Sequence, residues 1–237
     1  TSGTTGNPKG VLYSHRSTVL HSYAIILPDS LNVSAADIML PVVPMFHVNA
    51  WGTPYAAAMV GCTLVLPGPG LDGASLVNLI DTYKATQSGS KLDSLKRNVV
   101  GGSACPPAML RTFKEQFNCE TIHAWGMTET SPLGTANQLK TKHLQLSDEE
   151  KQQIRLTQGR PPFGVDLRLT DAEKGTHEIE RDGHTTGNLQ VKGHWVINHY
   201  FGKEESALTA DSWFDTGDIA TLNQDGFMKL SDRSKDL

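Results

Sequence analysis

The sequence is short of cysteine, and its charges are sparse and nearly balanced. Its 237 residues include three cysteines, Cys62, Cys105 and Cys119, without Cys-x-x-Cys spacing. This pattern does not indicate a disulfide scaffold and fits a reducing, intracellular compartment. The 21 Lys and Arg against 25 Asp and Glu give a net charge of −4. Because no basic stripe is available to neutralise a phosphate backbone, we do not expect nucleic acid as a partner.

Long apolar runs and an initiator methionine are also missing. The longest apolar runs, Tyr55–Val60 and Cys62–Leu66, are too short to span a bilayer. The chain opens directly on a glycine-rich segment and ends at Asp232–Leu237, so we expect it to be a piece of a longer protein. A hydrophobic fraction of 38% and a charged fraction of 19% fit a folded globular chain.

Helix-like and strand-like segments alternate in residues 1–135. Hydrophobic periodicity and turn residues predict helices at 17–27, 50–60, 74–83 and 106–117, and strands at 38–43, 62–66, 98–100 and 121–124. This alternation is typical of the α/β class, with a parallel-type sheet covered by helices. We therefore expect residues 1–135 to form one α/β subdomain.

The pattern changes in the second half of the chain. A capping box at Ser147–Glu150 predicts a charged surface helix over 147–156, within a helical connection at 136–160. Short strand-like segments separated by Asp and Gly turns follow, at 165–169, 188–191, 219–222 and 227–230. They predict a β-rich, partial β-barrel subdomain over 161–231.

The opening segment Thr1–Gly10 is the first candidate site. It packs Thr, Ser and Gly around one lysine, Lys9. Glycines allow successive backbone N–H groups to point at one anion, while hydroxyls and the lysine add donors and charge. The segment is not a Walker A loop, because Lys9 follows Pro8 and precedes Gly10. A flexible linker remains an alternative on the residues alone.

Gly68–Gly73 is a second glycine motif, which matches G-x-G-x-x-G between a strand and a helix. A dinucleotide-binding oxidoreductase is the function that this motif would predict. However, Pro69 removes a backbone donor, and Asp72 places a carboxylate where a pyrophosphate would lie. We therefore favour a strand-to-helix turn with Asp72 near the helix N-terminus.

Six motifs occur in one order along the chain. They are Thr1–Gly10, Pro44–Trp51, Gly101–Ala104, Trp125–Thr130, Trp213–Asp218 and Asp232–Asp236. This order resembles the adenylate-forming (AMP-binding) superfamily of acyl-CoA synthetases, luciferases and peptide-synthetase adenylation domains. The stretch from His47 to Trp51 is most similar to medium- and long-chain fatty-acyl-CoA synthetases. The resemblance implies a ligase that forms acyl-AMP and pyrophosphate from a fatty acid and ATP, then transfers the acyl group to coenzyme A.

The resemblance also implies roles for individual residues. Catalytic roles fall to Lys9, His47, Thr128 and Glu129, and a Mg²⁺ site to Thr1 and Glu129. Trp51 is implied as the gate of the acyl site. The implied nucleotide-binding residues are Thr1, Ser2, Gly3, Thr4, Thr5, Gly6, Lys9, Gly102, Ser103, His123, Ala124, Trp125, Thr128, Asp218, Arg233 and Lys235.

Three of these residues carry specific expectations. Trp125 occupies the position, usually Tyr in the family, that packs on adenine. Asp218 would accept hydrogen bonds from the ribose hydroxyls, since a carboxylate offers only acceptors. His47 would lie between the acyl carboxylate and the nucleotide. Without the resemblance, His47 and Trp51 would be interpreted as core residues four apart on one helix face.

The resemblance further implies fatty acid, ATP and coenzyme A as small-molecule substrates, with Mg²⁺, in a cytoplasmic protein. Peripheral membrane contact and a homodimer are left open. Residues 232–237 would begin a hinge to a C-terminal lid. Thr86–Ser90 runs directly into Lys91, where relatives carry a helix-length stretch, so the acyl chain length is not predicted. A catalytically inactive piece that at most binds nucleotide is the alternative.

Overall fold

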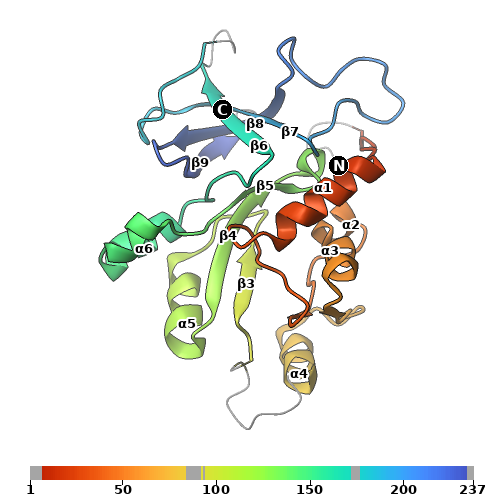
Figure 1. Ribbon diagram of the computed structural model, residues 1–237, viewed down its shortest axis with the longest axis vertical. Helices are drawn as coiled ribbons and strands as arrows, with labels where there is room; N and C mark the ends of the chain where they lie inside the picture. The colour runs from red at the N-terminus through yellow and green to blue at the C-terminus, as the bar shows by residue number, and fades with distance from the viewer. Residues whose placement is uncertain (1–6, 84–91, 93, 172–176, 234–237) are drawn as a thin grey trace.

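The computed structural model describes residues 7–83, 92, 94–171 and 177–233. It has two parts, an α/β part and a β-rich part stacked above it in the view of Figure 1. The subdomain boundaries at 135, 160 and 231 stay a prediction. Among the described residues, no helix is long and apolar enough to cross a membrane.

The α/β part contains parallel strand pairs flanked by helices, as the alternation of segments predicts. β3 (Arg97–Val100) pairs in parallel with β4 (Glu120–Gly126), and β1 (Ile38–Met39) pairs in parallel with β2 (Thr63–Leu64). The helices are α1 (His15–Ile26), α2 (Val48–Trp51), α3 (Thr53–Val60), α4 (Gly73–Tyr83) and α5 (Pro107–Phe117). In Figure 1, α5 lies on one side of β3 and β4, and α1 to α3 lie on the other.

A strand that the sequence pattern did not predict completes this sheet. β5 (Leu133–Ala136) runs antiparallel to β4 and is buried along its whole length. Between the two strands lies a single 3₁₀ turn, Thr128–Thr130. β5 shows no strand periodicity in the sequence, because it is only four residues long, follows Pro132 and contains Gly134.

The helix predicted over 50–60 is wrong in its first turn. Val48, Asn49, Ala50 and Trp51 have φ values of 51°, 52°, 50° and 59°, so α2 is a left-handed turn. Gly52, with φ 70°, ends it, and the right-handed helix α3 begins at Thr53. His47 and Trp51 therefore do not share a helix face. Each left-handed L-residue costs roughly 1–2 kcal/mol, which packing around this turn must offset.

The charged helix after the α/β part begins where its capping box predicts. α6 (Asp148–Arg155) is capped by Ser147, whose backbone N–H donates to Glu150 Oε2 at 2.9 Å, while the Glu150 N–H donates to Ser147 Oγ at 3.3 Å. None of its side chains is buried. α6 is therefore a surface helix, as expected from its composition.

The β-rich part is a four-stranded antiparallel sheet, which confirms the predicted change of pattern. Its order is β6 (Val165–Thr170), β7 (Gly187–Gly193), β8 (Phe214–Leu222) and β9 (Met228–Arg233). Alternate residues of β6, such as Leu167 and Leu169, are buried with Leu189 and Val191 of β7. Bridges from Ala136 to Arg160 and from Gly159 to Met228 join this sheet to the α/β part.

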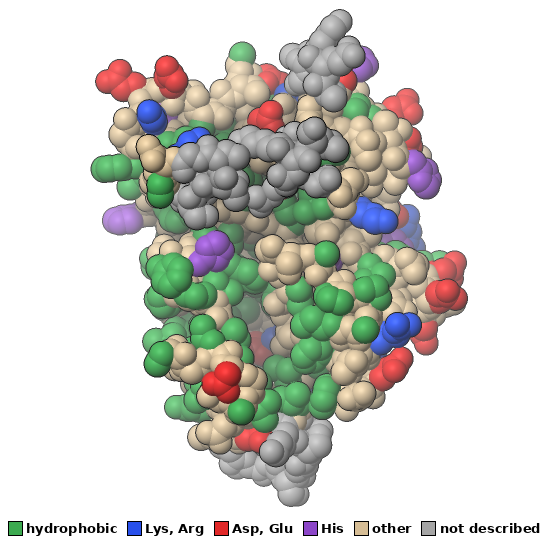
Figure 2. Space-filling view, turned by 180° about the vertical axis from the view of Figure 1, so that it is seen from behind, with side chains coloured by type: hydrophobic (Ala, Val, Ile, Leu, Met, Phe, Trp, Pro, Cys, Tyr) green, Lys and Arg blue, Asp and Glu red, His purple; other side chains and the backbone are tan. Residues whose placement is uncertain are grey.

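Exposed hydrophobic side chains are concentrated in the α/β part. Figure 2 shows them over the lower half of the molecule, on the face opposite to that of Figure 1. Most of the large exposed apolar residues precede residue 84, including Val19, Tyr23, Phe46 and Tyr55. The β-rich part contributes few.

Gly159 lies at the junction of the two parts and provides a test of the packing there. It has φ +85°, and a Cβ added to it would lie 2.3 Å from Ala136 C and O. We expect Gly159→Ala to lower the free energy of unfolding by about 3 kcal/mol, from backbone strain and overpacking together. Urea unfolding monitored by circular dichroism measures this difference.

Gly68 is the matched control for this substitution. It also has positive φ, +63°, but no atom lies within 4 Å of an added Cβ. Gly68→Ala should therefore cost only the conformational strain, about 1 kcal/mol. Equal losses in the two variants would contradict close packing at the junction.

Candidate functional site

The candidate residues gather where β3 and β4 end. Val100 pairs with His123, so β4 continues three residues beyond β3 to Gly126. Because the two strands are parallel, the segments after Val100 and after Gly126 emerge at the same edge of the sheet. This edge is where open α/β sheets bind their ligands.

Glu129 is a buried carboxylate at this edge, with 4% of its surface exposed. Its Oε1 accepts a hydrogen bond from the Tyr200 hydroxyl at 2.9 Å. The Lys9 ammonium lies over the Tyr200 ring, 4.8 Å from the centroid. Tyr13 donates its hydroxyl to Thr128 O at 2.6 Å. The fold thus brings together the predicted catalytic residues Lys9, Thr128 and Glu129.

Tyr13 and Tyr200, which connect these residues, do not stand out in the sequence. Burial raises the pKa of both phenols, and the negative charge of Glu129 raises the pKa of each further. Both therefore remain neutral donors at physiological pH. Tyr200, which donates to Glu129, lies 71 residues from it along the chain. No local sequence pattern could therefore indicate this contact.

The end of the glycine-rich segment is fixed against the β-rich part. The Phe201 N–H donates to Gly10 O at 2.9 Å, and Val11 forms a bridge with Tyr200. A Cβ at Gly10 would lie 2.9 Å from Phe201 Cβ, so this approach requires glycine. The predicted residues Thr1, Ser2, Gly3, Thr4, Thr5, Gly6 and Lys235 lie outside the described residues, as does the side chain of Arg233.

Trp125 and Asp218 form a direct contact between the two parts of the molecule. The indole Nε1–H donates to Asp218 Oδ2 at 2.9 Å. Both side chains are buried, with 6% and 8% of their surfaces exposed. The predicted adenine-stacking and ribose-binding residues are therefore neighbours, although they are 93 positions apart.

The predicted acyl gate lies at the same edge. The Trp51 ring contacts Gly101, since an added Cβ there would lie 2.8 Å from Trp51 Cη2. Gly102 and Ser103, which follow, are exposed. His47 is exposed too and occupies the N-terminal cap position of the left-handed turn that carries Trp51.

His123 lies beneath this edge and not on its surface. It is 1% exposed, with Nδ1 3.1 Å from Leu156 O and Nε2 3.3 Å from Ser103 O. Burial lowers its pKa, and the hydrogen bonds to backbone carbonyls oppose that shift. The ring links the loop that carries Ser103 to the segment after α6. Its neighbour Ala124 is also buried.

A buried histidine that the sequence did not single out positions the loop after Glu129. His21 Nε2 accepts the Leu133 N–H at 3.2 Å, and its ring packs edge-on against Trp195 at 6.0 Å. Trp195 Nε1 in turn donates to Leu133 O at 2.8 Å. Burial lowers the pKa of His21 to about 3, so it is neutral at physiological pH.

The second glycine motif has the structure of a turn. Asp72 Oδ1 accepts the Ser75 N–H at 3.0 Å, and Oδ2 accepts the Ser75 hydroxyl at 2.6 Å. The first of these bonds satisfies one of the N-terminal backbone donors of α4. Asp72 is thus the cap residue that the sequence favoured.

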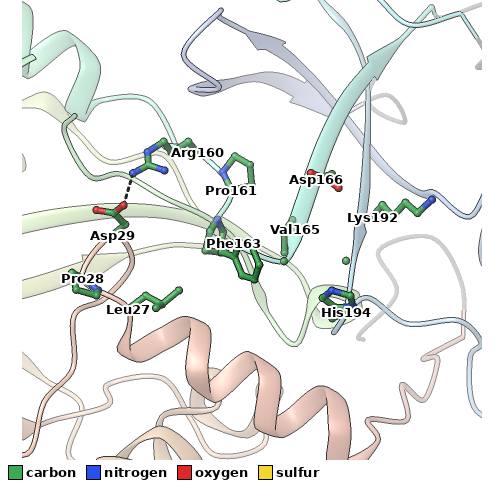
Figure 3. A pocket seen from close by; sticks show the side chains of 13 residues that line it. Leu27, Pro28, Asp29, Arg160, Pro161, Phe163, Val165, Asp166, Lys192 and His194 are labelled. Atoms are coloured by element: carbon green, nitrogen blue, oxygen red, sulfur yellow. Dashed lines mark ion pairs between the residues drawn. The ribbon is translucent and has the colours of Figure 1, made fainter. Parts of the chain in front are cut away.

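A cavity of about 920 Å³ opens elsewhere, between the end of α1 and the beginning of β6. Figure 3 shows Asp29 and Arg160 paired at its rim, with Nη2 3.0 Å from Oδ2, and Phe163 projecting beside them. None of the predicted catalytic or nucleotide-binding residues lines it. We therefore place the candidate site at the sheet edge and not in this cavity.

Comparison with known proteins identifies the family of the chain. The sequence profile described as AMP-binding enzyme matches residues 1–201. The chain belongs to the AMP-binding enzyme family. A medium-chain-fatty-acid–CoA ligase from Ectopseudomonas oleovorans is 56% identical over 254 aligned residues, which cover all of this chain and 46% of that protein. A long-chain-fatty-acid–CoA ligase from Thermus thermophilus is 45% identical over 257, with 47% of its length covered.

Another curated relative is named for a different acid. A 3-methylmercaptopropionyl-CoA ligase from Ruegeria lacuscaerulensis is 54% identical over 254 residues and 47% covered. The chain thus spans about half the length of the curated relatives it matches. The alignments are longer than the 237 residues of this chain, so they contain positions at which it has no residue. The gap expected near Thr86–Lys91 falls on residues outside those described.

Solved structures show the same fold. O-succinylbenzoate coenzyme A synthetase from Bacillus subtilis, in complex with AMP, aligns with a TM-score of 0.79 at 24% identity, covering all of this chain and 49% of that one. A long-chain-fatty-acid–CoA ligase from Archaeoglobus fulgidus aligns with a TM-score of 0.78 at 22% identity, covering 97% of this chain and 50% of that one. At these identities the comparison establishes the mixed α/β fold alone.

The Tyr200 hydroxyl should contribute measurably to stability. Tyr200→Phe deprives a buried carboxylate of a donor, and we expect the free energy of unfolding to fall by about 2 kcal/mol. Tyr13→Phe removes a bond to a neutral carbonyl and should cost about 1 kcal/mol. Urea unfolding at neutral pH compares the two. A larger loss for Tyr13→Phe would argue against the Tyr200–Glu129 bond.

His21 should make stability depend on pH. Its pKa is lower in the folded chain than in the unfolded one, so the unfolded chain binds the proton first as the pH falls. Stability should decrease between about pH 6.5 and pH 3, by up to about 1.4 kcal/mol per pH unit from this group. His21→Gln keeps an acceptor but cannot titrate, so its decrease over this range should be shallower.

Asp225 supplies the control for that experiment. Its pKa is lowered to about 2, mainly by a hydrogen bond from Lys142, so Asp225→Asn should alter the pH dependence only below about pH 4. Chemical unfolding at half-unit pH steps measures all three proteins. If the original chain and His21→Gln show parallel curves from pH 6.5 to 4, His21 is not the titrating group.

Proposed function

We propose that this chain carries the nucleotide- and acyl-binding part of an ATP-dependent fatty-acid–CoA ligase. The observation that carries the proposal is the cluster of Lys9, Tyr200 and Glu129 at the carboxyl edge of β3 and β4, beside the Trp125–Asp218 pair. In this reaction a carboxylate attacks the α-phosphate of ATP, giving acyl-AMP and pyrophosphate. The acyl group then passes to the thiol of coenzyme A.

The reaction needs positioning and charge neutralisation, because both partners are anions. Lys9, at the end of the glycine-rich segment, supplies a positive charge for the phosphates. Thr128, whose carbonyl oxygen accepts a hydrogen bond from Tyr13, is the residue proposed to contact the α-phosphate. Trp51 and Gly101 would form the wall of the acyl site, with His47 nearby.

The residues present fit a Mg²⁺ ion. Glu129 provides a carboxylate oxygen, which is the ligand type that Mg²⁺ prefers, and Thr1 is its proposed companion. Within the described ranges, no three His, Cys, Asp or Glu side chains converge. A site with a single protein carboxylate, Glu129, suits a metal that takes most of its ligands from phosphate and water. When bound, it would neutralise phosphate charge.

Medium- or long-chain fatty acids are the proposed acids, with coenzyme A as acceptor, because relatives with these printed activities match the whole chain at 45–56% identity. A cytoplasmic location belongs to the same proposal. Sedimentation would decide between a monomer and a homodimer. Since the chain spans about half of its relatives, a second candidate is a chain that binds nucleotide without turnover.

Binding of Mg²⁺-ATP tests the proposal. We expect Glu129→Gln to weaken it at least tenfold, because a carboxylate that contacts the metal is lost. Glu149→Gln, on the exposed face of α6, should leave binding unchanged. Isothermal titration calorimetry measures the affinities, and fatty-acid-dependent release of pyrophosphate measures turnover. Binding without release would favour the second candidate, and no binding would refute both.

A further inference from the structure

The indole of Trp125 is held in one orientation by its surroundings. Its six-membered ring lies on Gly134 of β5, where an added Cβ would come within 2.3 Å of Trp125 Cζ3. Any larger residue at that position would displace the ring. The burial of the indole and this contact leave the Nε1–H directed at Asp218.

The sheet around Asp218 is irregular on both sides. The pairing of β7 with β8 shifts register between Asn188 and Gln190, and that of β8 with β9 shifts between Ile219 and Ala220. Such irregularities re-aim side chains and disrupt the ladder locally. The geometry of the sheet therefore does not by itself fix the orientation of the Asp218 carboxylate. A hydrogen bond from outside the sheet can fix it.

We propose that Trp125 is a positioning residue, whose indole N–H orients the Asp218 carboxylate to receive the ribose hydroxyls of a bound nucleotide. This inference rests on the proposed function. An ionised carboxylate has about four acceptor positions, and the indole is a donor only. The bond from Trp125 uses one of these positions and restricts the rotation of the carboxylate. A bond from a donor to a buried carboxylate is also among the stronger kinds.

A tyrosine at this position could not make this bond in the same way. A phenol carries its donor at the tip of a six-membered ring, whereas the indole carries its N–H on the side of the five-membered ring. The tryptophan thus couples the aromatic surface proposed for the base to the carboxylate proposed for the sugar. Discrimination of ribose from deoxyribose is the property that this coupling would control.

Nucleotide discrimination by Trp125→Phe tests the inference. The full 237-residue chain is titrated with ATP, 2′-deoxy-ATP and 3′-deoxy-ATP in the presence of Mg²⁺. We expect the original chain to prefer ATP to at least one deoxy analogue. In Trp125→Phe, affinity for ATP should fall about tenfold, the value of one hydrogen bond to a charged group. Affinity for that analogue should change little, so the preference is lost.

Trp195→Phe is the matched control. Trp195 is a second buried indole, and its Nε1–H donates to the backbone oxygen of Leu133 at 2.8 Å. Its replacement removes the same kind of bond away from Asp218. We expect the three affinities to change by one common factor, with the preference for ATP kept. If Trp125→Phe also changes all three by one common factor, Trp125 has a structural role only and the inference is wrong.

Failure of the inference is distinguishable from failure of the proposed function. A chain that binds ATP but does not distinguish it from either deoxy analogue refutes the inference and leaves the function standing. A chain that binds none of the three nucleotides refutes the proposed function, and the ribose contact with it.

A spectroscopic measurement on the tryptophan side chains does not require Trp125→Phe to fold. The chain has four tryptophans, hence four indole N–H signals in a ¹H–¹⁵N spectrum. Single replacements of the others assign the Trp125 signal by elimination. It should move in Asp218→Asn, and in the original chain it should move when AMP is added but less with at least one of 2′-deoxy-AMP and 3′-deoxy-AMP. Equal shifts with all three nucleotides, or none in Asp218→Asn, would overturn the inference.

Discussion

The parallel pairing of β3 with β4 places most of the candidate site. Its register matches Val100 with His123, so β4 continues for three residues past the end of β3 and carries Trp125 there. β5 covers the other side of that extension. The chain then turns through Thr128–Thr130, which puts Glu129 beside Tyr200 of the β-rich part. A shift of one residue in this register would turn the Trp125 side chain to the opposite face of the sheet.

Much of the fold could be predicted from the sequence because its signals are local. The capping box at Ser147 gives the beginning of α6, and alternating hydrophobic residues give β6. The turn at Val48–Trp51 could not be predicted, since an apolar run has the same periodicity whichever way the backbone winds. Of the candidate site, only the residues that belong to the ordered sequence motifs could be predicted. Tyr200 and His21 have partners 71 and 112 residues away, and only tertiary packing reveals them.

The left-handed turn illustrates how such strain is tolerated. Val48 and Ala50 are buried, and the Thr53 hydroxyl donates to Ala50 O at 2.7 Å. Gly52 closes the turn, where an added Cβ would lie 2.9 Å from the His21 ring. Strained backbone that persists in a fold is often found beside functional groups. Here it presents Trp51 to Gly101, at the edge where the proposed nucleotide-binding residues also lie.

The electrostatics of the site follow from the kind of donor that meets each buried carboxylate. Tyr200 donates to Glu129 and Trp125 donates to Asp218, and both donors are neutral. An arginine or lysine in either place would satisfy the carboxylate by cancelling its charge. A phenol or an indole orients the carboxylate without itself contributing a charge. With a net charge of −4 the chain as a whole does not attract phosphates. A negative charge preserved at Glu129 can instead attract a cation, and that cation, with Lys9, can make the edge of the sheet favourable for a polyphosphate.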